Sequence, residues 1–453
     1  MAVILFQSTN EQSPSVNLRE ALLTGQAPDR GLYHPREFPH FTPAEIATFA
    51  GLPYHQIAFQ VLGRYAEGIL SAEALAELCR DAYSFEVPLE KVFDRVHVMR
   101  LDRGPTASFK DFAARMMARW MGRFVSETNQ ALTILTATSG DTGSAVASAF
   151  HGVAGIRVFV LFPLDEVSDR QRKQMTTLRG NIRTLAIDGK FDDCQALVKR
   201  AFADPALRFI PLSSANSINI GRLLPQSVYY FYAASRLAQP GEPIVFAVPS
   251  GNFGDMMGAV MAGQMGLPIK KLVVPVNGND EFPRFLATGV YQKIEPSRNC
   301  LSNAMNVGHP SNLARLVAVY GGHMDEDGVI HRPPDLAALR RDLFSTAVSD
   351  EQTRTTIQQA WADHALLLEP HGAVGWRGFL DYVAVEPLNG SPAVVLETAH
   401  PAKFPEEIER VLGFTPDVPP ALAALDQLAE DYDILPVDYE SFRSYLIRKH
   451  ALH

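Results

Sequence analysis

The stretch LDRGPTASFKDFAARMMARWM, residues 101–121, leads from a Gly-Pro turn through a small polar run into a helical pattern. Phe112, Met116 and Trp120 recur at every fourth position, which is typical of one face of an α-helix. Lys110 therefore lies where a loop becomes a helix, between two phenylalanines. An ammonium in apolar surroundings loses hydration and its pKa falls, as a lysine that forms a Schiff base requires. Taken alone, the stretch favours an ordinary helix-start lysine with its ammonium in water.

The composition predicts a globular protein of two or three domains, since 453 residues are 47% hydrophobic and 20% charged. The net charge of -9 argues against a nucleic-acid or anionic-membrane surface, so we expect a small-molecule partner. Cys79, Cys194 and Cys300 lie far apart without metal-ligand spacing, which predicts no metal site and a reducing, cytoplasmic location. The chain start lacks a signal-peptide pattern, and no apolar run approaches the roughly 18 residues of a membrane span.

A second signal is the segment 132–150, LTILTATSGDTGSAVASAF. Its apolar start predicts a strand over 132–135, and the small residues at its end predict a helix after a loop rich in Gly, Ser and Thr. A loop between a strand and a helix start turns free backbone N–H groups toward an anion. A tight strand-to-helix turn with an N-cap has the same pattern, so one such loop leaves both interpretations open.

The segment 243–262, PIVFAVPSGNFGDMMGAVMA, repeats this layout, with a predicted strand over 244–248 and a helix after the SGNFGD loop. Two such loops indicate an anion site more strongly than one does. Neither loop has the full GxGxxG spacing, Asp280 lies too far along the chain for a ribose contact, and no Walker lysine is present. We therefore expect a lone phosphate ester and not a nucleotide.

The segment 213–222, SSANSINIGR, is dense in Ser and Asn and ends in Arg222. Hydroxyls, amides and a guanidinium suit an oxyanion or a phosphate. A capped loop before a helix over 223–238 explains the composition equally well. His371 is a candidate catalytic residue at the end of a helix, although a lone histidine is more often structural.

Further strands are expected to alternate with helices over 96–101, 158–163, 182–187, 271–276 and 393–397. This alternation predicts an α/β fold, whose ligands bind at the carboxyl ends of the strands. The polar turn 398–404, TAHPAKF, follows the last of these strands.

Several of these motifs together resemble those of the threonine synthase family. They are GLYHP, GPTASFKDFAARMM, TATSGDTGSAVA, SANSINIGRLLPQ, VPSGNFGDMMGA, LSNAMNV, EPHGAVGWR and ETAHPAKF, in this order. The resemblance implies the α/β fold of type II pyridoxal-phosphate (PLP) enzymes, similar to the tryptophan synthase beta chain. In that fold two open twisted α/β lobes hold the cofactor between them, here with a mostly helical N-terminal region added.

The resemblance also suggests how the chain is divided. We expect an N-terminal threonine synthase region over 1–95 and a large PLP-binding lobe formed by 96–125 and 240–400. A smaller α/β lobe is expected over 126–239, and a C-terminal helical extension over 401–453.

The resemblance further implies roles for individual residues. Lys110 would form the Schiff base with pyridoxal 5'-phosphate, and Thr398 would face the pyridine nitrogen. The cofactor phosphate would be held by Gly251, Asn252, Phe253, Gly254 and Asp255. The substrate carboxylate and the cofactor's 3' oxygen would be faced by Ser139, Gly140, Asp141 and Thr142. The substrate phosphate would be bound by Asn216, Ser217 and Arg222. Because a carboxylate beside a phosphate is repulsive, we expect Asp255 to orient the glycine loop without touching the phosphate oxygens.

The implied activity is the conversion of O-phospho-L-homoserine and water into L-threonine and phosphate, the last step of threonine biosynthesis. The alternative is a related type II lyase, such as a phospho-lyase or a dehydratase that gives a 2-oxo acid. A non-catalytic binding protein of the same fold is expected to lack the lysine, which is present here. Many family members carry Phe-His where this chain has Asp102-Arg103, so a role of that histidine does not transfer. We expect a monomer or a homodimer.

Overall fold

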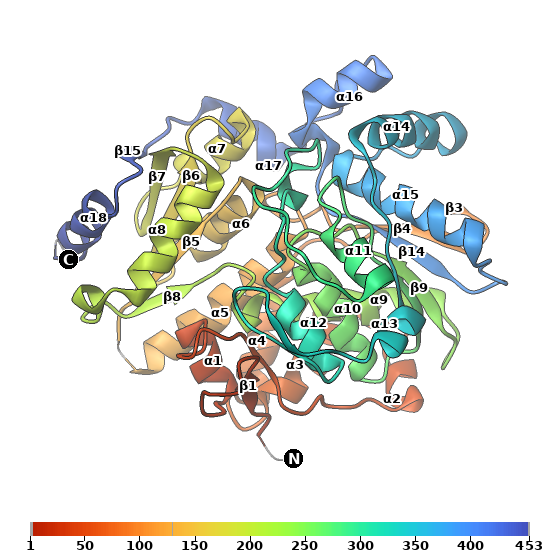
Figure 1. Ribbon diagram of the computed structural model, residues 1–453, viewed down its shortest axis with the longest axis horizontal. Coiled ribbons are helices and arrows are strands. Elements are labelled where there is room, and N and C mark those ends of the chain that lie inside the picture. Colours follow the sequence, from red (N-terminus) through yellow and green to blue (C-terminus); the bar gives the residue numbers. More distant parts are fainter. Residues whose placement is uncertain (1–2, 129, 452–453) are drawn as a thin grey trace.

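The computed structural model describes residues 3–128 and 130–451. Two sheets flanked by helices organise the chain, a six-stranded sheet and a five-stranded one (Figure 1). Within the described residues, no helix is long and apolar enough to cross a membrane.

The six-stranded sheet has the order β13-β10-β9-β14-β4-β3. Its strands are β3 (Leu89–Phe93), β4 (Val96–Arg100), β9 (Ile244–Ala247), β10 (Ile269–Val273), β13 (Leu343–Phe344) and β14 (Ala393–Glu397). All neighbours are parallel except the edge pair β3 and β4. Because β4, β14 and β9 are adjacent and parallel, the loops that follow them meet at one edge of the sheet. These loops carry Lys110, Thr398 and the SGNFGD motif.

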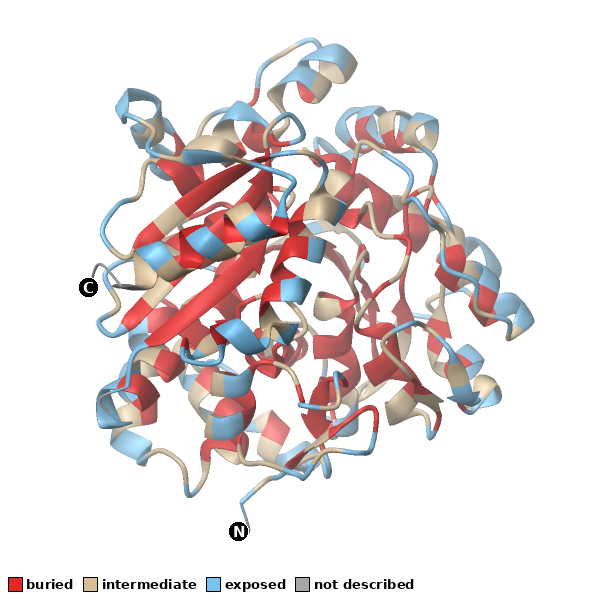
Figure 2. Cartoon of the chain, turned by 60° about the vertical axis from the view of Figure 1, so that its left-hand side comes forward, coloured by how far each residue is buried: buried red, intermediate tan, exposed pale blue. Residues whose placement is uncertain are grey.

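The five-stranded sheet has the order β15-β7-β6-β5-β8 and is wholly parallel. Its strands are β5 (Leu132–Ala137), β6 (Ile156–Pro163), β7 (Ile182–Asp188), β8 (Leu212–Ser214) and β15 (Asp433–Pro436). The helices α6 (Asp141–Phe150), α7 (Asp169–Thr176) and α8 (Phe191–Ala203) connect its central strands. Figure 2 shows the long strands of this sheet as buried, as expected for parallel strands covered on both faces.

The N-terminal region is mostly helical. Its elements are β1 (Phe6–Ser8), α1 (Leu18–Thr24), β2 (Tyr33–Pro35), α2 (Pro43–Ala47), α3 (Tyr54–Ala66) and α4 (Ala72–Ala82). The strands β1 and β2 form a small antiparallel pair, and α3 and α4 pack against α9 and α5. Capping boxes begin α1 and α2, with Asn17 and Glu20 in the first and Thr42 and Glu45 in the second.

The remaining elements cover the two sheets and continue to the C-terminus. The helices are α5 (Lys110–Thr128), α9 (Ser227–Leu237), α10 (Gly254–Gln264), α11 (Glu281–Thr288), α12 (Leu313–Val319), α13 (Leu336–Asp342), α14 (Asp350–His364), α15 (Pro370–Val385), α16 (Pro405–Leu412), α17 (Pro420–Ala423) and α18 (Tyr439–Ala451). A two-stranded sheet is formed by β11 (His323–Met324) and β12 (Ile330–Arg332). Short 3-10 helices include η2 (Ile220–Arg222), η3 (Leu224–Gln226), η4 (Asn303–Met305) and η5 (Pro401–Lys403).

The structure differs from the sequence-based expectation at several places. The segment 401–453, expected to be helical, contains β15, which pairs with β7 of the smaller sheet (Figure 1). Residues 89–93, which were expected to belong to the mostly helical N-terminal region, form the strand β3 at the edge of the larger sheet. The helix expected over 223–238 begins only at Ser227, because two 3-10 turns precede it and Pro225 cannot donate an N–H.

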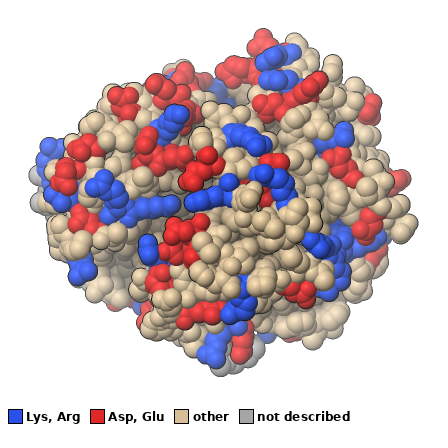
Figure 3. All heavy atoms as spheres, in the orientation of Figure 1, with Lys and Arg blue, Asp and Glu red and all other residues tan. Residues whose placement is uncertain are grey.

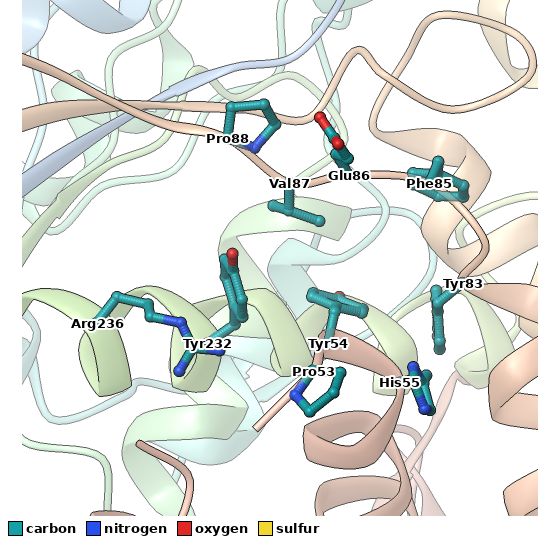
Figure 4. A pocket seen from close by; sticks show the side chains of 10 residues that line it. All are labelled: Pro53, Tyr54, His55, Tyr83, Phe85, Glu86, Val87, Pro88, Tyr232 and Arg236. Atoms are coloured by element: carbon teal, nitrogen blue, oxygen red, sulfur yellow. The ribbon is translucent and has the colours of Figure 1, made fainter. Parts of the chain in front are cut away.

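Phe112, two residues after Lys110, is the centre of an aromatic cluster that joins three parts of the chain. Its ring meets those of Tyr54, Phe85 and Tyr229 edge-on, with centroids 5.4, 5.0 and 5.4 Å away. Tyr54 and Phe85 also line a cavity of about 430 Å³ between α3 and α9 (Figure 4). The cluster therefore anchors the first turn of α5 to the N-terminal region and to α9.

We expect Phe112→Ala to lower the free energy of unfolding by about 3–5 kcal/mol, because it removes a fully buried ring and leaves a void among aromatic neighbours. Urea denaturation followed by circular dichroism measures this change. The matched control is Phe209→Ala, since that ring is 58% exposed and its loss should change stability by no more than about 0.5 kcal/mol. Equal destabilisation in both variants would contradict the central place of Phe112.

Candidate active site

Lys110 is the first residue of α5, and its side chain is nearly buried. The loop before it is fixed to the end of β14, because the Phe109 N–H donates to the Thr398 carbonyl at 2.9 Å. The Lys110 Nζ lies 4.5 Å from the centroid of the Phe109 ring and 3.8 Å from Asp141 Oδ2. Burial lowers the pKa of Lys110 below its ordinary value, which favours the neutral, nucleophilic amine. The interpretation of Lys110 as a solvated helix-start lysine is therefore wrong.

A cavity of about 1200 Å³ brings the expected site residues together. It is lined by Lys110, Ser139, Asp141, Thr142, Asn216, Ser217, Arg222, Gly251, Asn252, Phe253, Gly254, Asp255 and Thr398. Gly140, between Ser139 and Asp141, is not part of this lining; its φ of 135° and the nearby Gln171 side chain leave no room for a Cβ. Segments far apart in the sequence thus supply one site.

The glycine loop 251–254 joins β9 to the N-terminus of α10. Within the described residues, no protein acceptor receives the N–H groups of this loop. Phe253 holds the left-handed conformation, with φ 61°, and its ring packs on Phe282 at 4.8 Å. A Cβ on Gly251 would lie 2.8 Å from the Met305 Cα, so the close packing requires glycine there. Free N–H groups at a helix N-terminus form a suitable site for a phosphate.

Asp255 was expected to orient the glycine loop, but its carboxylate contacts other groups. It is buried, and its Oδ1 accepts hydrogen bonds from the hydroxyls of Tyr229 and of Tyr230, the latter at 2.6 Å. The carboxylate thus ties α10 to α9 and does not cap the N–H groups of the glycine loop. Its Oδ2 has no protein partner, and burial raises the pKa of Asp255 to about 6.

We expect Asp255→Asn to change how stability depends on pH. A carboxyl whose folded pKa is raised stabilises the fold most below its unfolded pKa of 3.8, and this contribution is lost as pH rises through about 6. As pH rises from about 4 to above 6, the native protein should therefore lose stability relative to the Asn variant. The loss is roughly 1.4 kcal/mol for each unit between the folded and unfolded pKa of Asp255. Urea midpoints from pH 4 to 8 measure the difference, and parallel curves for the two proteins would refute it.

The loop 136–143 joins β5 to α6 and is held by the Thr138 hydroxyl, which accepts the N–H groups of Gly140 and Gly143 at 2.9 and 2.8 Å. In the described part of the chain, the N–H groups of residues 141–142 have no protein acceptor. They lie at the first turn of α6, where the helix dipole favours an anion.

In the segment 213–222, several side chains hydrogen-bond to the backbone, whereas the guanidinium of Arg222 is incompletely paired. Asn216 bonds the end of β5, donating from Nδ2 to the Ala137 carbonyl at 2.8 Å and accepting the Ala137 N–H at 3.3 Å. Arg222 is 3% exposed and donates from Nη1 to the Ala215 carbonyl at 2.7 Å. Its Nε has no protein partner, and burial lowers its pKa to about 10. A buried guanidinium of this kind suits an anionic ligand.

Other residues that sequence reasoning left without a role support the site. Lys403 is buried, with Nζ 2.6 Å from Asp141 Oδ1. Arg315 donates to the carbonyls of Ser217 and Ile218 at 3.0 and 2.5 Å and so holds the 213–222 segment. The sequence signal that could have identified Lys403 is its place in the turn after β14, a central parallel strand.

His371 was expected at the end of a helix, but it is the second residue of α15. It lines the cavity, and both of its ring nitrogens have partners, as in a structural histidine. Its Nδ1 lies 2.5 Å from Glu369 Oε2, and its Nε2 accepts the Ala304 N–H at 3.1 Å. Asp102 and Arg103, the two residues before the Gly-Pro turn, have different surroundings. Asp102 is buried and pairs with Arg100 at 2.8 Å, whereas Arg103 is partly exposed and does not line the cavity.

A family model described as pyridoxal-phosphate dependent enzyme matches residues 87–398, which include Lys110, the loops 136–143 and 251–254, and Thr398. The donors present fit this cofactor, since a buried lysine and a loop of free N–H groups face one cavity. The chain is thus a pyridoxal-phosphate-dependent enzyme of fold type II.

Two further models, described as threonine synthase N terminus and threonine synthase, C-terminal, match residues 5–83 and 372–446. The threonine synthases of Pseudomonas aeruginosa and Escherichia coli are 37% and 38% identical to this chain, each over 97% of both sequences. The crystal structure of PLP-bound threonine synthase from Brucella melitensis has a TM-score of 0.91 at 35% identity and covers 98% of this chain and 99% of its own. This chain belongs to the threonine synthase family.

Proposed function

We propose that this protein converts O-phospho-L-homoserine and water into L-threonine and phosphate. The observation that carries this assignment is a nearly buried lysine in a cavity that is also lined by two groups suited to anions. The glycine loop supplies free N–H groups on one side, and the guanidinium of Arg222 has an open Nε on the other. A phosphorylated cofactor and a phosphorylated substrate need two such places.

Pyridoxal phosphate would be held by the residues around the glycine loop and the end of β14. We assign its phosphate to the N–H groups of residues 251–254 and its pyridine nitrogen to Thr398. Lys110 would bind it covalently, since it is the buried lysine that lines the cavity beside these groups. When bound, the cofactor supplies an electron sink for charge that develops at the substrate Cα. A hydroxyl such as Thr398 favours a neutral ring, because it donates a hydrogen bond where a carboxylate would favour a charged nitrogen.

The substrate would lie between the β5–α6 loop and the 213–222 segment. We assign its carboxylate to residues 139–142, where free N–H groups begin a helix. Its phosphate is assigned to Arg222 together with Ser217, while Asn216 positions this segment against β5. Lys110 is the base nearest these groups, and in its neutral form it can take the Cα proton and return a proton later.

The test is to measure phosphate release and amino-acid products from O-phospho-L-homoserine with purified protein loaded with pyridoxal phosphate. Equal amounts of phosphate and threonine would support the assignment. A 2-oxo acid in place of threonine would instead indicate a related lyase, and no phosphate release would overturn both. Serine and threonine serve as control substrates, since they lack the phosphate for which Arg222 is assigned.

We further propose a cytoplasmic monomer or homodimer that acts on small molecules. The three cysteines are unpaired, as expected in a reducing compartment. Acidic and basic side chains are interspersed over the face shown in Figure 3, which is the pattern of an ordinary solvated surface.

A further inference from the structure

The carboxylate of Asp141 lies between two lysines at the base of the cavity. Lys403 Nζ is 2.6 Å from Asp141 Oδ1, and Lys110 Nζ is 3.8 Å from Asp141 Oδ2. The side chains of Lys403 and Asp141 are 0% and 2% exposed, whereas that of Lys110 is 12% exposed. Two cations thus share one buried anion, and the residue assigned to the cofactor has the longer contact.

The contacts of Lys403 are directed and leave it little freedom. Its Nζ also donates to the Thr106 carbonyl at 3.1 Å, a residue in the loop that leads to Lys110. Gln171 donates to the same Asp141 Oδ1 at 3.0 Å. Oδ1 is therefore occupied by Lys403 and Gln171, and only Oδ2 faces Lys110.

We propose that Lys403 is a positioning residue that neutralises Asp141 and thereby keeps Lys110 available as a free amine for the cofactor. This role rests on Lys110 being the cofactor-bound lysine. Lys403 does not touch the reacting atoms in this scheme. It acts through Asp141, and through Thr106 it also fixes the loop that carries Lys110.

The electrostatic argument follows from the charges that face Lys110. Burial is the largest influence that lowers its pKa, and the positive charges of Lys403 and Arg222 lower it further. The negative charges of Asp141 and Glu369 raise it, and Asp255 lines the same cavity. Without Lys403, a buried carboxylate would lack its nearest counterion, and Lys110 would become its sole ammonium partner. A charged Lys110 cannot attack the cofactor aldehyde, because the lone pair carries a proton.

The experiment follows attachment of pyridoxal phosphate to the apoprotein by absorbance from pH 6 to 10, without substrate. We expect Lys403→Met to slow attachment at pH 7 roughly tenfold or more and to move the half-maximal pH upward by about one unit or more. Lys403→Arg should restore part of the rate, because it returns the charge. Lys173→Met, which removes a partly exposed lysine on α7, is the matched control and should match the native protein.

A double variant separates the electrostatic role from a merely structural one. Lys403→Met with Asp141→Asn removes both the cation and the carboxylate it neutralises, so the half-maximal pH should return toward the native value. A folded Lys403→Met protein with an unchanged half-maximal pH would overturn the proposal. So would a double variant whose half-maximal pH is as high as that of Lys403→Met alone. If Lys403→Met does not fold, Asp141→Asn alone is decisive, since it must lower the half-maximal pH. Inactivity toward O-phospho-L-homoserine would count against the proposed function only, because attachment is measured without substrate.

Discussion

Lys110→Ala is expected to lose turnover by roughly 10⁴-fold or more while the protein stays folded. The amine that would bind the cofactor and carry the Cα proton is removed. The cavity is also lined by Lys199 and Lys293, but both of these are exposed, whereas Lys110 is nearly buried. The fold should tolerate the change because Asp141 keeps Lys403 as its partner at 2.6 Å. Turnover is measured as phosphate release, and folding by circular dichroism and thermal unfolding.

Borohydride reduction of the native protein with pyridoxal phosphate tests the same assignment chemically. The cofactor should be trapped on a peptide that contains Lys110, and Lys110→Ala should give no such peptide. Lys91→Ala is the matched control, since Lys91 is exposed on the edge strand β3 and should leave both readouts unchanged. Trapping on a different lysine would refute the assignment of Lys110.

Arg222→Ala should weaken binding of O-phospho-L-homoserine by about one to two decades, or roughly 1.5–3 kcal/mol, because one charge-assisted partner of a phosphate is lost. The cofactor should remain bound, since its phosphate is assigned to the backbone of residues 251–254. Inhibition by free phosphate should weaken in parallel. Arg222→Lys should recover only part of the affinity, because an ammonium restores the charge without the planar guanidinium.

Two titrations on the same Arg222→Ala protein decide between the phosphate sites, one with pyridoxal phosphate and one with substrate. If cofactor affinity collapses while substrate affinity holds, the two sites have been assigned the wrong way round. Arg103→Ala provides the control, because Arg103 is partly exposed and lies outside the lining of the cavity. Arg103→Ala should change neither titration. A loss of substrate affinity in this variant would indicate that position 103 takes part in substrate binding.

Much of the fold follows from local patterns in the sequence. The strands β4, β5, β6, β7, β9 and β14 are four to eight residues long and rich in apolar residues, and each was predicted to within a few residues. The shorter strands β8, β13 and β15 were not predicted, because two to four residues at the border of a sheet carry no periodic pattern of their own. Their strand conformation depends on the neighbour that supplies their hydrogen bonds.

The sequence alone determined which loops meet at the cavity. A strand followed by a small-residue loop and a helix start has a defined local geometry, and parallel neighbours place such loops at one edge of a sheet. Only the tertiary structure decided what each side chain in those loops contacts. Lys403 donates a hydrogen bond to Thr106, which is 297 residues away in the sequence. Asp255 follows the glycine loop directly, yet its carboxylate accepts hydrogen bonds from two tyrosines of α9. Such contacts depend on burial and on the partners that folding brings close, because a buried charge is stable only when something distant in the chain neutralises it or holds it by hydrogen bonds.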